Sequence, residues 1–390
     1  AISTILSVQN SLVCGILDAL RRLGVAVRAA KCGPDYLDPM WLARASGAPC
    51  PNLDPWMSGE VGVRELASGP GTLVVESAMG LYDGIRPDSD EGSAAQVARI
   101  LGIPVLLVVD ASGSARTVAA VVKGMRDFGD LPVAGVVANR VGGEGHARLV
   151  AQALASAELP PLVGHLREGA FPAMPERHLG LVQPDQESDR TLRAMGQAVG
   201  ETVDLDRIVS LCGPLPRVPA AAVRERPGRG LRLGLSWDEA FGFAYGPFVS
   251  RLERAGVEVV RFSPLRDREL PRGLDGLWIC GGYPESHARE LSDNRAMRDS
   301  VAAFCGSGAP VLAECGGLLY LSTEIVDHDG GAFPMCGVVP ARGVMGRRLR
   351  SLGYRTATAR GDLFLAVRGG RLRGHEFHYG ELEGVPSGVG

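Results

Sequence analysis

The chain has 390 residues, a length that fits two domains of roughly 200 residues each. Hydrophobic residues make up 45% and charged residues 22% of the sequence, which excludes wholesale disorder, and the eight cysteines form no C-x-x-C pair, which favours reduced thiols. The net charge is −3, with no basic block typical of nucleic-acid binding, no apolar run that could span a membrane and no recognisable targeting segment, so we expect a cytoplasmic protein.

The first half of the sequence alternates apolar runs of strand length with amphipathic helical stretches. The Val-rich runs predict strands at 25–30, 71–77, 104–111 and 133–140. Apolar residues at three-to-four spacing predict helices at 15–24, 93–102, 114–129 and 146–157. Continuous apolar runs are typical of strands buried on both faces of a parallel sheet. The pattern therefore predicts a doubly wound α/β domain.

The composition and periodicity of the sequence change after residue 200, which indicates a second domain. The stretch 213–230 is rich in Pro, Gly and Arg, and we place a linker at 206–230 between a first domain at 1–205 and a second at 231–390. A second α/β series follows, with strands expected at 231–237, 256–264, 275–282 and 310–317 and a β-rich tail from 332 to 383.

One cysteine follows an expected strand in a pattern that suits a nucleophile. Cys315 lies between the strand "PVLAE" and two glycines that open a helical run, an arrangement that lifts a side chain above the edge of a sheet. By itself the pattern also fits a buried structural cysteine before a glycine turn. Candidate partners are the backbone N–H groups near Gly281, Gly282 and Gly316 for an oxyanion hole, and His375 or His378 for a base.

The motifs of the second half carry a family resemblance. "CGGYPE", "AECGGLLYL", "SLGY" and "GHEFHY", in that order, resemble the class I glutamine amidotransferase domain of cobyrinic and cobyric acid synthases, which implies a flavodoxin-like fold. By this resemblance Cys315 forms a glutamyl thioester that supplies ammonia, His378 is the base, and His375 and Glu376 support it. Many class I amidotransferases carry a Glu two residues after that His. Gly380 occupies the position here, so we predict a Cys–His dyad.

The first half resembles the N-terminal domain of cobyrinic acid a,c-diamide synthases, in the dethiobiotin-synthetase-like superfamily of P-loop NTPase folds. The matching segments include "KCGPDYLDP", "VVESAMGLYDG" and "VVANRVGGEGH". The resemblance implies that ATP and Mg²⁺ activate a carboxylate as an acyl phosphate. It implies roles for eight residues: Glu76 and Asp35 at the metal, Lys31 at phosphate, Asn139 and Arg140 at the nucleotide base, and Asp38, Tyr82 and Asp83 at the substrate.

The N-terminal segment departs from this family pattern. The family's phosphate-binding loop, of the G-x-x-x-x-G-K-[ST] type, should fall on residues 3–11, which contain no glycine. Gln9 stands where the Lys belongs and Asn10 where the hydroxyl belongs. Three explanations stay open: the sequence lacks or mistranslates its natural N-terminal segment, the chain has lost the use of ATP, or another cation such as Lys31 or an arginine substitutes.

Together the two resemblances imply an ATP- and glutamine-dependent carbon–nitrogen ligase of cobalamin biosynthesis. Its expected substrates are glutamine and the a and c acetate carboxylates of cobyrinic or hydrogenobyrinic acid. Two alternatives remain: amidation of another tetrapyrrole (sirohydrochlorin, siroheme or Ni-sirohydrochlorin), and an ATP-inactive paralogue that binds a tetrapyrrole. We expect neither nucleic acid nor membrane as a partner, and the family pattern suggests a homodimer.

Overall fold

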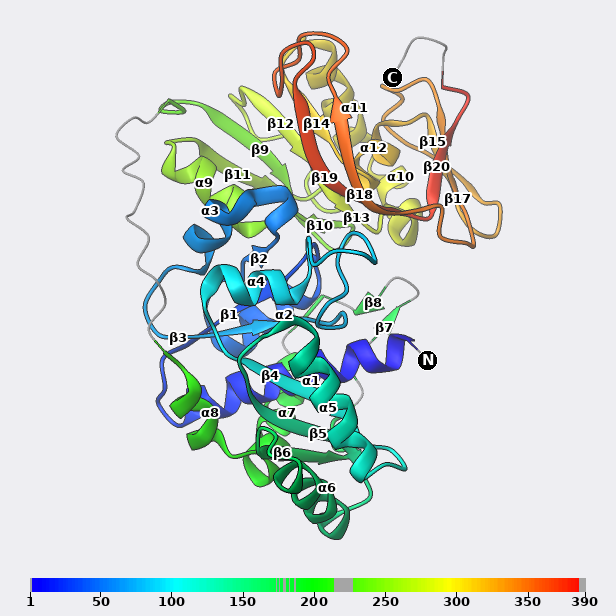
Figure 1. Cartoon of the computed structure of the whole chain (residues 1–390). Helices are drawn as coiled ribbons and strands as arrows, with labels where there is room; N and C mark the ends of the chain where they lie inside the picture. Colours follow the sequence, from blue (N-terminus) through cyan, green and yellow to red (C-terminus); the bar gives the residue numbers. More distant parts are fainter. Residues whose placement is uncertain are drawn as a thin grey trace. The chain divides into compact units, whose positions relative to one another are not determined.

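The computed structural model describes residues 2–172, 174, 176–177, 180–181, 183–185, 187–213 and 227–385. The chain divides into two compact units, Ala1–Ala220 and Ala221–Gly390 (Figure 1). Of the linker expected at 206–230, the first part belongs to helix α8 (Leu205–Leu211), and residues 214–226 lie outside the described residues. Within the described part of the chain, no helix is both long and apolar enough to cross a membrane.

The first unit opens with a long helix, α1 (Ile2–Arg22), which packs against α7 (Ser188–Thr202). Leu12, Ile16 and Leu20 recur at four-residue spacing and are buried, as expected for the inner face of a helix. The expectation of a loop at 3–11 is wrong. That segment lacks glycine and proline, and its apolar residues continue the helical spacing, so it extends α1 instead.

The parallel strands of the first unit form two three-stranded sheets within the described residues, where the sequence predicted one. One sheet has the order β2-β1-β3, and the other has the order β4-β5-β6. All four strands expected in this half are confirmed. The strands are β1 (Val27–Cys32), β2 (Asn52–Leu53), β3 (Thr72–Glu76), β4 (Val105–Asp110), β5 (Val133–Val141) and β6 (Leu162–Arg167).

Helices connect these strands, as the alternating pattern predicts. In α4 (Ala94–Leu101), the Ser93 side chain accepts a hydrogen bond from the Gln96 N–H, and Gly102 ends the helix in a left-handed conformation. Val136, Val137 and Ala138 of β5 are fully buried, which confirms a strand covered on both faces. The other elements are α2 (Asp38–Ser46), α3 (Pro55–Ala67), α5 (Arg116–Gly129), α6 (Glu144–Ser156) and the hairpin β7 (Glu176–Arg177) to β8 (Gly180–Leu181).

The second unit is built on a four-stranded parallel sheet of order β11-β9-β12-β14. Its strands are β9 (Arg232–Ser236), β11 (Glu258–Phe262), β12 (Gly276–Ile279) and β14 (Val311–Ala313). Strand β10 (Phe241–Phe243) pairs with β13 (Gly281–Gly282), directly after β12. The helices are α9 (Gly246–Arg254), η1 (Pro284–His287), α10 (Ala288–Asp293), α11 (Arg295–Gly306) and α12 (Gly316–Leu321).

The expected β-rich tail is confirmed and has two parts. One is a four-stranded sheet formed by β16 (Ala332–Pro334), β15 (Glu324–Val326), β17 (Arg342–Met345) and β20 (Gly380–Glu383). The other is an antiparallel hairpin of β18 (Ser351–Thr358) and β19 (Arg371–His378). The hairpin carries His375, Glu376 and His378 on one continuous strand.

Candidate functional site

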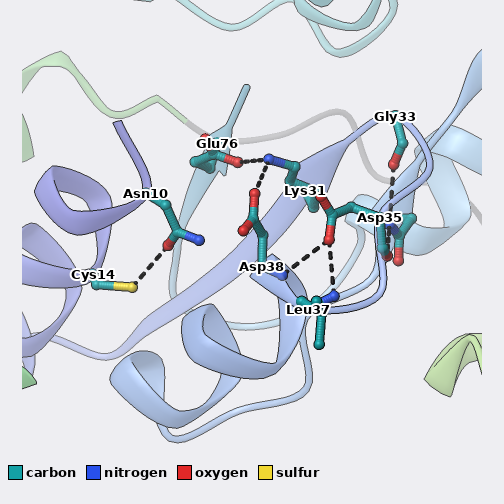
Figure 2. Close-up of polar contacts among 9 residues, drawn as sticks. Asn10, Cys14, Lys31, Gly33, Asp35, Leu37, Asp38 and Glu76 are labelled. Atoms are coloured by element: carbon teal, nitrogen blue, oxygen red, sulfur yellow. Dashed lines mark hydrogen bonds and ion pairs between the residues drawn. The ribbon is translucent and has the colours of Figure 1, made fainter. Parts of the chain in front are cut away.

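A buried charge cluster lies where β1 and β3 end in the first unit. These strands pair in parallel with Lys31 opposite Glu76, so both side chains reach the carboxyl edge of the sheet together. The Lys31 Nζ donates to Asp38 Oδ2 at 2.6 Å and to Glu76 Oε2 (Figure 2). Lys31 and Glu76 are 3% and 1% exposed, and the Asp38 side chain is 15% exposed. Three residues assigned different roles from the sequence therefore form a single cluster.

Negative charge exceeds positive charge in this cluster. Burial raises the pKa of Glu76 to about 7, with Asp38 adding to the shift and Lys31 opposing it. Burial and the neighbouring Asp38 likewise raise the pKa of Asp35 to about 6, again against Lys31. Burial acts to lower the pKa of Lys31, but the surrounding carboxylates outweigh it and raise that pKa. The cluster thus holds three carboxyl groups and one ammonium, which contacts Asp38 and Glu76, and this excess of carboxyl groups favours a second cation.

Two polar atoms beside the cluster are buried and lack a hydrogen-bond partner among the described residues. They are Glu76 Oε1 and Asn10 Nδ2. The other atom of the Asn10 amide, Oδ1, accepts a hydrogen bond from Cys14 Sγ at 3.1 Å. Figure 2 shows the Asn10 amide on the same side of Lys31 as Asp38 and Glu76. An unpaired buried donor and an unpaired buried acceptor each cost about 1–3 kcal/mol, which a bound polar group would recover.

The face of α1 that carries Asn10 packs close to the cluster. Burial raises the pKa of the Cys14 thiol, and the negative charges of Asp38 and Glu76 raise it further. The side chain of Gln9, the other residue predicted at a nucleotide from this segment, lies outside the described residues. Helix α1, rather than the expected loop, therefore positions Asn10 beside the cluster.

Asp35 orders the loop after β1 instead of contacting Lys31. Its Oδ1 accepts hydrogen bonds from the backbone N–H groups of Leu37 at 2.8 Å and Asp38 at 2.9 Å. The Asn52 amide holds the same loop by donating to the carbonyls of Gly33 at 3.0 Å and Asp35 at 2.7 Å. Asp38, which the sequence assigned to the substrate, is the carboxylate that joins Glu76 around the ammonium.

Asn139 and Arg140 lie near the carboxyl end of β5, in the other sheet of the first unit. Asn139 stands opposite Asp110 in the register of β4 and β5, and its Oδ1 accepts from the Arg140 backbone N–H at 2.9 Å. The Arg140 guanidinium pairs with Asp110 at 3.1 Å and with Glu168 at 3.4 Å. The sequence analysis missed Asp110, although a carboxylate ending an apolar parallel strand was a usable signal.

Tyr82 and Asp83 belong to the loop between β3 and α4. The Tyr82 hydroxyl donates to the Met125 carbonyl at 2.5 Å, and its ring meets Phe128 edge-on with centroids 4.9 Å apart. Asp83 is exposed, and its backbone N–H donates to the Gly80 carbonyl at 3.0 Å. Tyr82 is thus anchored on α5, while the Asp83 carboxylate faces solvent.

The donor set of the cluster suits a magnesium ion held jointly with phosphate. Among the described residues, no group of three or more His, Cys, Asp or Glu side chains could hold a metal ion by itself. Mg²⁺ characteristically takes one or two carboxylates and completes its shell with water and substrate phosphates. Glu76 and Asp38 supply such a pair, and the unpartnered Glu76 Oε1 gives it a ready oxygen ligand.

A second site lies in the second unit, where Cys315 follows β14. Cys315 has φ 49° and ψ −111°, a left-handed conformation that costs a residue with a side chain of order 1–3 kcal/mol. Glycines 316 and 317 then begin α12, and the Cys315 carbonyl accepts hydrogen bonds from Leu318 and Leu319. This is the strand–turn–helix geometry that exposes a nucleophile above a sheet, as the sequence predicted.

The predicted oxyanion glycines surround this cysteine. Strands β12 and β14 are paired neighbours, so Gly281 and Gly282, just after β12, lie beside the turn. A Cβ placed on Gly281 would lie 3.6 Å from the Cys315 Cβ, and one placed on Gly316 would lie 3.2 Å from the Gly282 nitrogen. A Cβ on Gly282 would lie 2.0 Å from the Ala240 carbonyl oxygen. Close approach of backbone therefore requires glycine at position 282.

Cys315 is exposed, but the surroundings of its thiol raise the thiol pKa rather than lower it. Desolvation by surrounding protein raises its pKa, the nearby backbone N–H of Gly316 opposes this, and the carboxylates of Glu285 and Glu314 reinforce it. Glu314 itself accepts a hydrogen bond from the Trp278 indole at 2.7 Å. The thiol thus needs a base to reach its nucleophilic form.

His378, the predicted base, is engaged on both ring nitrogens. Nδ1 lies 2.6 Å from the Gly380 carbonyl oxygen, and Nε2 lies 2.8 Å from Glu376 Oε1. Glu376 also pairs with Arg355 Nε at 2.8 Å, and its hydrogen bonds to Ser351 and His378 lower its pKa. Among the described residues, both hydrogen bonds of the His378 ring go to Gly380 and Glu376 and neither goes to Cys315, so Nε2 must leave Glu376 to act on the thiol. Arg355 is a residue that the sequence analysis missed.

His375 lies on the opposite face of β19 from His378, because the strand runs without a bulge between them and side chains alternate. Its ring meets Tyr354 on β18 edge-on, with centroids 5.3 Å apart. Glu376, the other residue predicted to support the base, shares the face of His378 and contacts its ring.

Both halves of the chain match known families. Residues 11–182 match the CobQ/CobB/MinD/ParA nucleotide binding domain, and residues 235–387 match the CobB/CobQ-like glutamine amidotransferase domain. The chain is 43% identical over 391 residues to the cobyrinate a,c-diamide synthase of Syntrophotalea carbinolica, covering 98% of this chain and 85% of the relative. The chain belongs to the cobyrinate and hydrogenobyrinate a,c-diamide synthase family.

Further relatives agree across most of the chain. The hydrogenobyrinate a,c-diamide synthase of Streptomyces coelicolor is 43% identical, over 95% of this chain and 84% of the relative. The cobyrinate a,c-diamide synthase of Dehalococcoides mccartyi strain 195 is 37% identical, over 96% and 83%. Membership of this family confirms the recognised resemblance, the two-domain α/β fold class and the predicted enzyme class, a glutamine amidotransferase ligase with a nucleotide-binding domain.

Proposed function

We propose that this chain uses ATP, Mg²⁺ and glutamine to amidate the a and c acetate carboxylates of cobyrinic or hydrogenobyrinic acid. The names and extent of similarity of the relatives carry the reaction class. The observation that carries the chemistry is the pair of sites, each with a coherent set of groups: a carboxylate–ammonium cluster in the first unit and a strained cysteine in the second. The predicted homodimer remains an expectation of the same proposal.

In the first unit, Glu76 and Asp38 would hold Mg²⁺, and Lys31 would contact phosphate. When bound, Mg-ATP supplies the phosphoryl group that activates a carboxylate toward ammonia. The carboxyl edge of β1 and β3 presents Lys31 and Glu76 together, and burial strengthens their electrostatic effect on a bound phosphate. Asn139 and Arg140, at the same end of the neighbouring sheet's strand β5, remain the proposed contacts to the nucleotide base.

In the second unit, Cys315 would attack the side-chain amide of glutamine. The thiol proton passes to His378 and from there to the amide nitrogen. The C–N bond then breaks, ammonia leaves, and water hydrolyses the remaining thioester to glutamate and the free thiol. Backbone N–H groups at Gly282 and Gly316 would receive the oxyanion, and the packing of these glycines against the turn that carries the thiol supports this role. The Gly380 carbonyl orients the histidine by accepting from Nδ1, at the position where other class I amidotransferases carry a Glu.

Product mass spectrometry tests the proposal directly. The full chain would be incubated with Mg-ATP, glutamine and, separately, hydrogenobyrinic acid, cobyrinic acid and sirohydrochlorin. A mass decrease of about 1 Da per carboxyl group converted to amide, twice on one of the first two rings, is the expected result. Amide formation on sirohydrochlorin alone would show that the substrate is another tetrapyrrole. Glutamine hydrolysis without any amide would overturn the synthetase function and favour a tetrapyrrole-binding paralogue.

A further inference from the structure

A buried carboxylate anchors the strand that packs on the predicted oxyanion glycines. Asp238 lies in the turn between β9 and β10 and is 7% exposed. Its Oδ1 accepts hydrogen bonds from the backbone N–H groups of Ala240 at 2.9 Å and Phe241 at 3.0 Å. Its Oδ2 accepts hydrogen bonds from Ser263 Oγ at 2.8 Å and the Leu265 N–H at 3.0 Å. The carboxylate therefore ties the start of β10 to the loop after β11.

The start of β10 in turn holds the backbone at Gly282. The Ala240 carbonyl accepts a hydrogen bond from the Tyr283 N–H at 2.8 Å, and Phe241 stands opposite Gly282 in the register of β10 and β13. A Cβ placed on Gly282 would lie 2.0 Å from the Ala240 carbonyl oxygen and 2.8 Å from the Phe241 Cα. Because Ala240 and Phe241 are also fully buried, a shift at either one displaces Gly282.

The Gly282 nitrogen lies on the side of the cysteine turn. A Cβ placed on Gly316 would approach this nitrogen to 3.2 Å, and one placed on Gly281 would lie 3.6 Å from the Cys315 Cβ. Hydrogen bonds to β10 and the packing of β10 on Gly282 thus connect the Asp238 carboxylate with a group proposed for the oxyanion. An oxyanion donor acts only within about 2.7–3.1 Å of the developing charge, so a small displacement of this N–H would weaken it.

We infer that Asp238 is a positioning residue for glutamine hydrolysis, and that it holds the Gly282 N–H at the oxyanion through β10. The inference rests on the proposed attack of Cys315 on glutamine. Without the carboxylate, the buried Ala240 N–H loses its acceptor, so β10 shifts and Gly282 follows. Because the oxyanion exists only in the transition state and the tetrahedral intermediate, the loss falls on kcat rather than on KM.

The first test compares glutamine hydrolysis by the full chain and its variants, measured as glutamate released. Asp238→Ala should lower kcat about 10²-fold and leave KM within about threefold, as expected for a displaced oxyanion donor. Asp238→Asn should lower kcat about tenfold, because its amide oxygen still accepts on one side while its NH2 group meets N–H donors on the other.

Asp267→Asn is the matched control for this series. The Asp267 carboxylate also accepts a hydrogen bond from a backbone N–H, that of Ser263 at 2.7 Å, but both of these residues belong to the loop after β11. Asp267→Asn should therefore leave kcat unchanged. A folded Asp238→Asn variant with unchanged kcat would overturn the inference. Failure of both Asp238 variants to fold, by circular dichroism, would also overturn it, because it would assign Asp238 to folding rather than to positioning.

Alkylation of Cys315 by iodoacetamide separates positioning from general loss of structure. In this reaction the thiolate sulfur bonds to the CH2 carbon as iodide leaves, so no oxyanion forms. We expect the alkylation rate of the peptide that contains Cys315, followed by mass spectrometry, to change less than about twofold in Asp238→Asn, since the thiol itself is not disturbed. Alkylation and hydrolysis falling in parallel would show that Asp238 merely supports the cysteine turn, which contradicts the inference.

These outcomes are separable from failure of the proposed function. An unmodified chain that hydrolyses no glutamine would remove the Cys315 reaction and the positioning role together. Glutamine hydrolysis by the unmodified chain, with Asp238→Asn equally fast, would leave the reaction standing and remove only the role of Asp238.

Discussion

The two candidate sites are built in opposite ways. The cysteine turn draws Cys315 and Gly316 from adjacent positions, and its strain is local to one residue with φ 49°. The charge cluster draws Lys31, Asp38 and Glu76 from two strands and a helix, and burial controls its electrostatics. One site depends on backbone conformation and the other on charge balance in a dry environment. Substitutions should therefore harm the first by steric conflict and the second by unpaired charge.

The largest expected effect comes from a substitution that stops amidation from glutamine but not amidation from free ammonia. Cys315→Ala should lower glutamine-dependent amidation by at least about 10³-fold, because no other group can form the thioester. Amidation from added ammonium chloride should persist, since the charge cluster is untouched. Both rates would be read as product mass against time. Glutamine-dependent turnover surviving at more than a few per cent of the original rate would show that Cys315 is not the nucleophile.

A smaller effect should follow from a single methyl group at the cysteine turn. Gly282→Ala places a Cβ 2.0 Å from the Ala240 carbonyl oxygen, so the backbone must shift away from the oxyanion position. We expect glutaminase kcat/KM to fall about 10²-fold, and stability to fall by about 1–3 kcal/mol. Gly306→Ala is the matched control, because nothing beyond its chain neighbours and the backbone of its own helix lies within 4 Å of the added Cβ. Equal rates for the two variants would show that backbone approach at Gly282 is unimportant.

The smallest expected effect is a pH dependence of stability that the charge cluster causes. Burial raises the pKa of Glu76 to about 7 from its ordinary 4.5. The folded protein then holds a proton that the unfolded chain releases between these values, so stability should fall as pH rises from about 5 to 7. Glu76→Gln should remove part of this loss, on the order of 1–3 kcal/mol, in urea unfolding with a metal chelator present.

In the Glu76→Gln variant, stability should still fall to some extent as the pH rises, because the pKa of Asp35 is also raised, to about 6. Asp127→Asn is the control for the pH experiment. Asp127 is exposed, and its hydrogen bonds to Lys123 and Arg126 lower its pKa. Its contribution to stability is therefore lost as the pH falls, at more acidic pH than this range, which is the opposite direction to that of Glu76. A curve for Glu76→Gln that parallels the unmodified chain between pH 5 and 7 would contradict the assigned electrostatics.

Patterns of residues close together in the chain allowed the strands, the crossover helices and the cysteine turn to be predicted from the sequence. The Val-rich runs and Gly-ended helices predicted the strands and crossover helices, because burial on both faces and left-handed caps leave direct marks in sequence. Cys315 and its flanking glycines were identified for the same reason, since a turn between a strand and a helix is encoded by adjacent residues. The membership of the family likewise followed from contiguous motifs.

Only the tertiary structure decided which charged groups meet. The sequence assigned Lys31, Asp38 and Glu76 to phosphate, substrate and metal, yet strand pairing and the loop after β1 bring all three to one buried point. It also paired Arg355 with Glu376 beside His378, and it showed residues 3–11 as helix rather than loop. The physical reason is that a charge pair depends on distance and burial in space, and neither quantity is written in the spacing of residues along the chain.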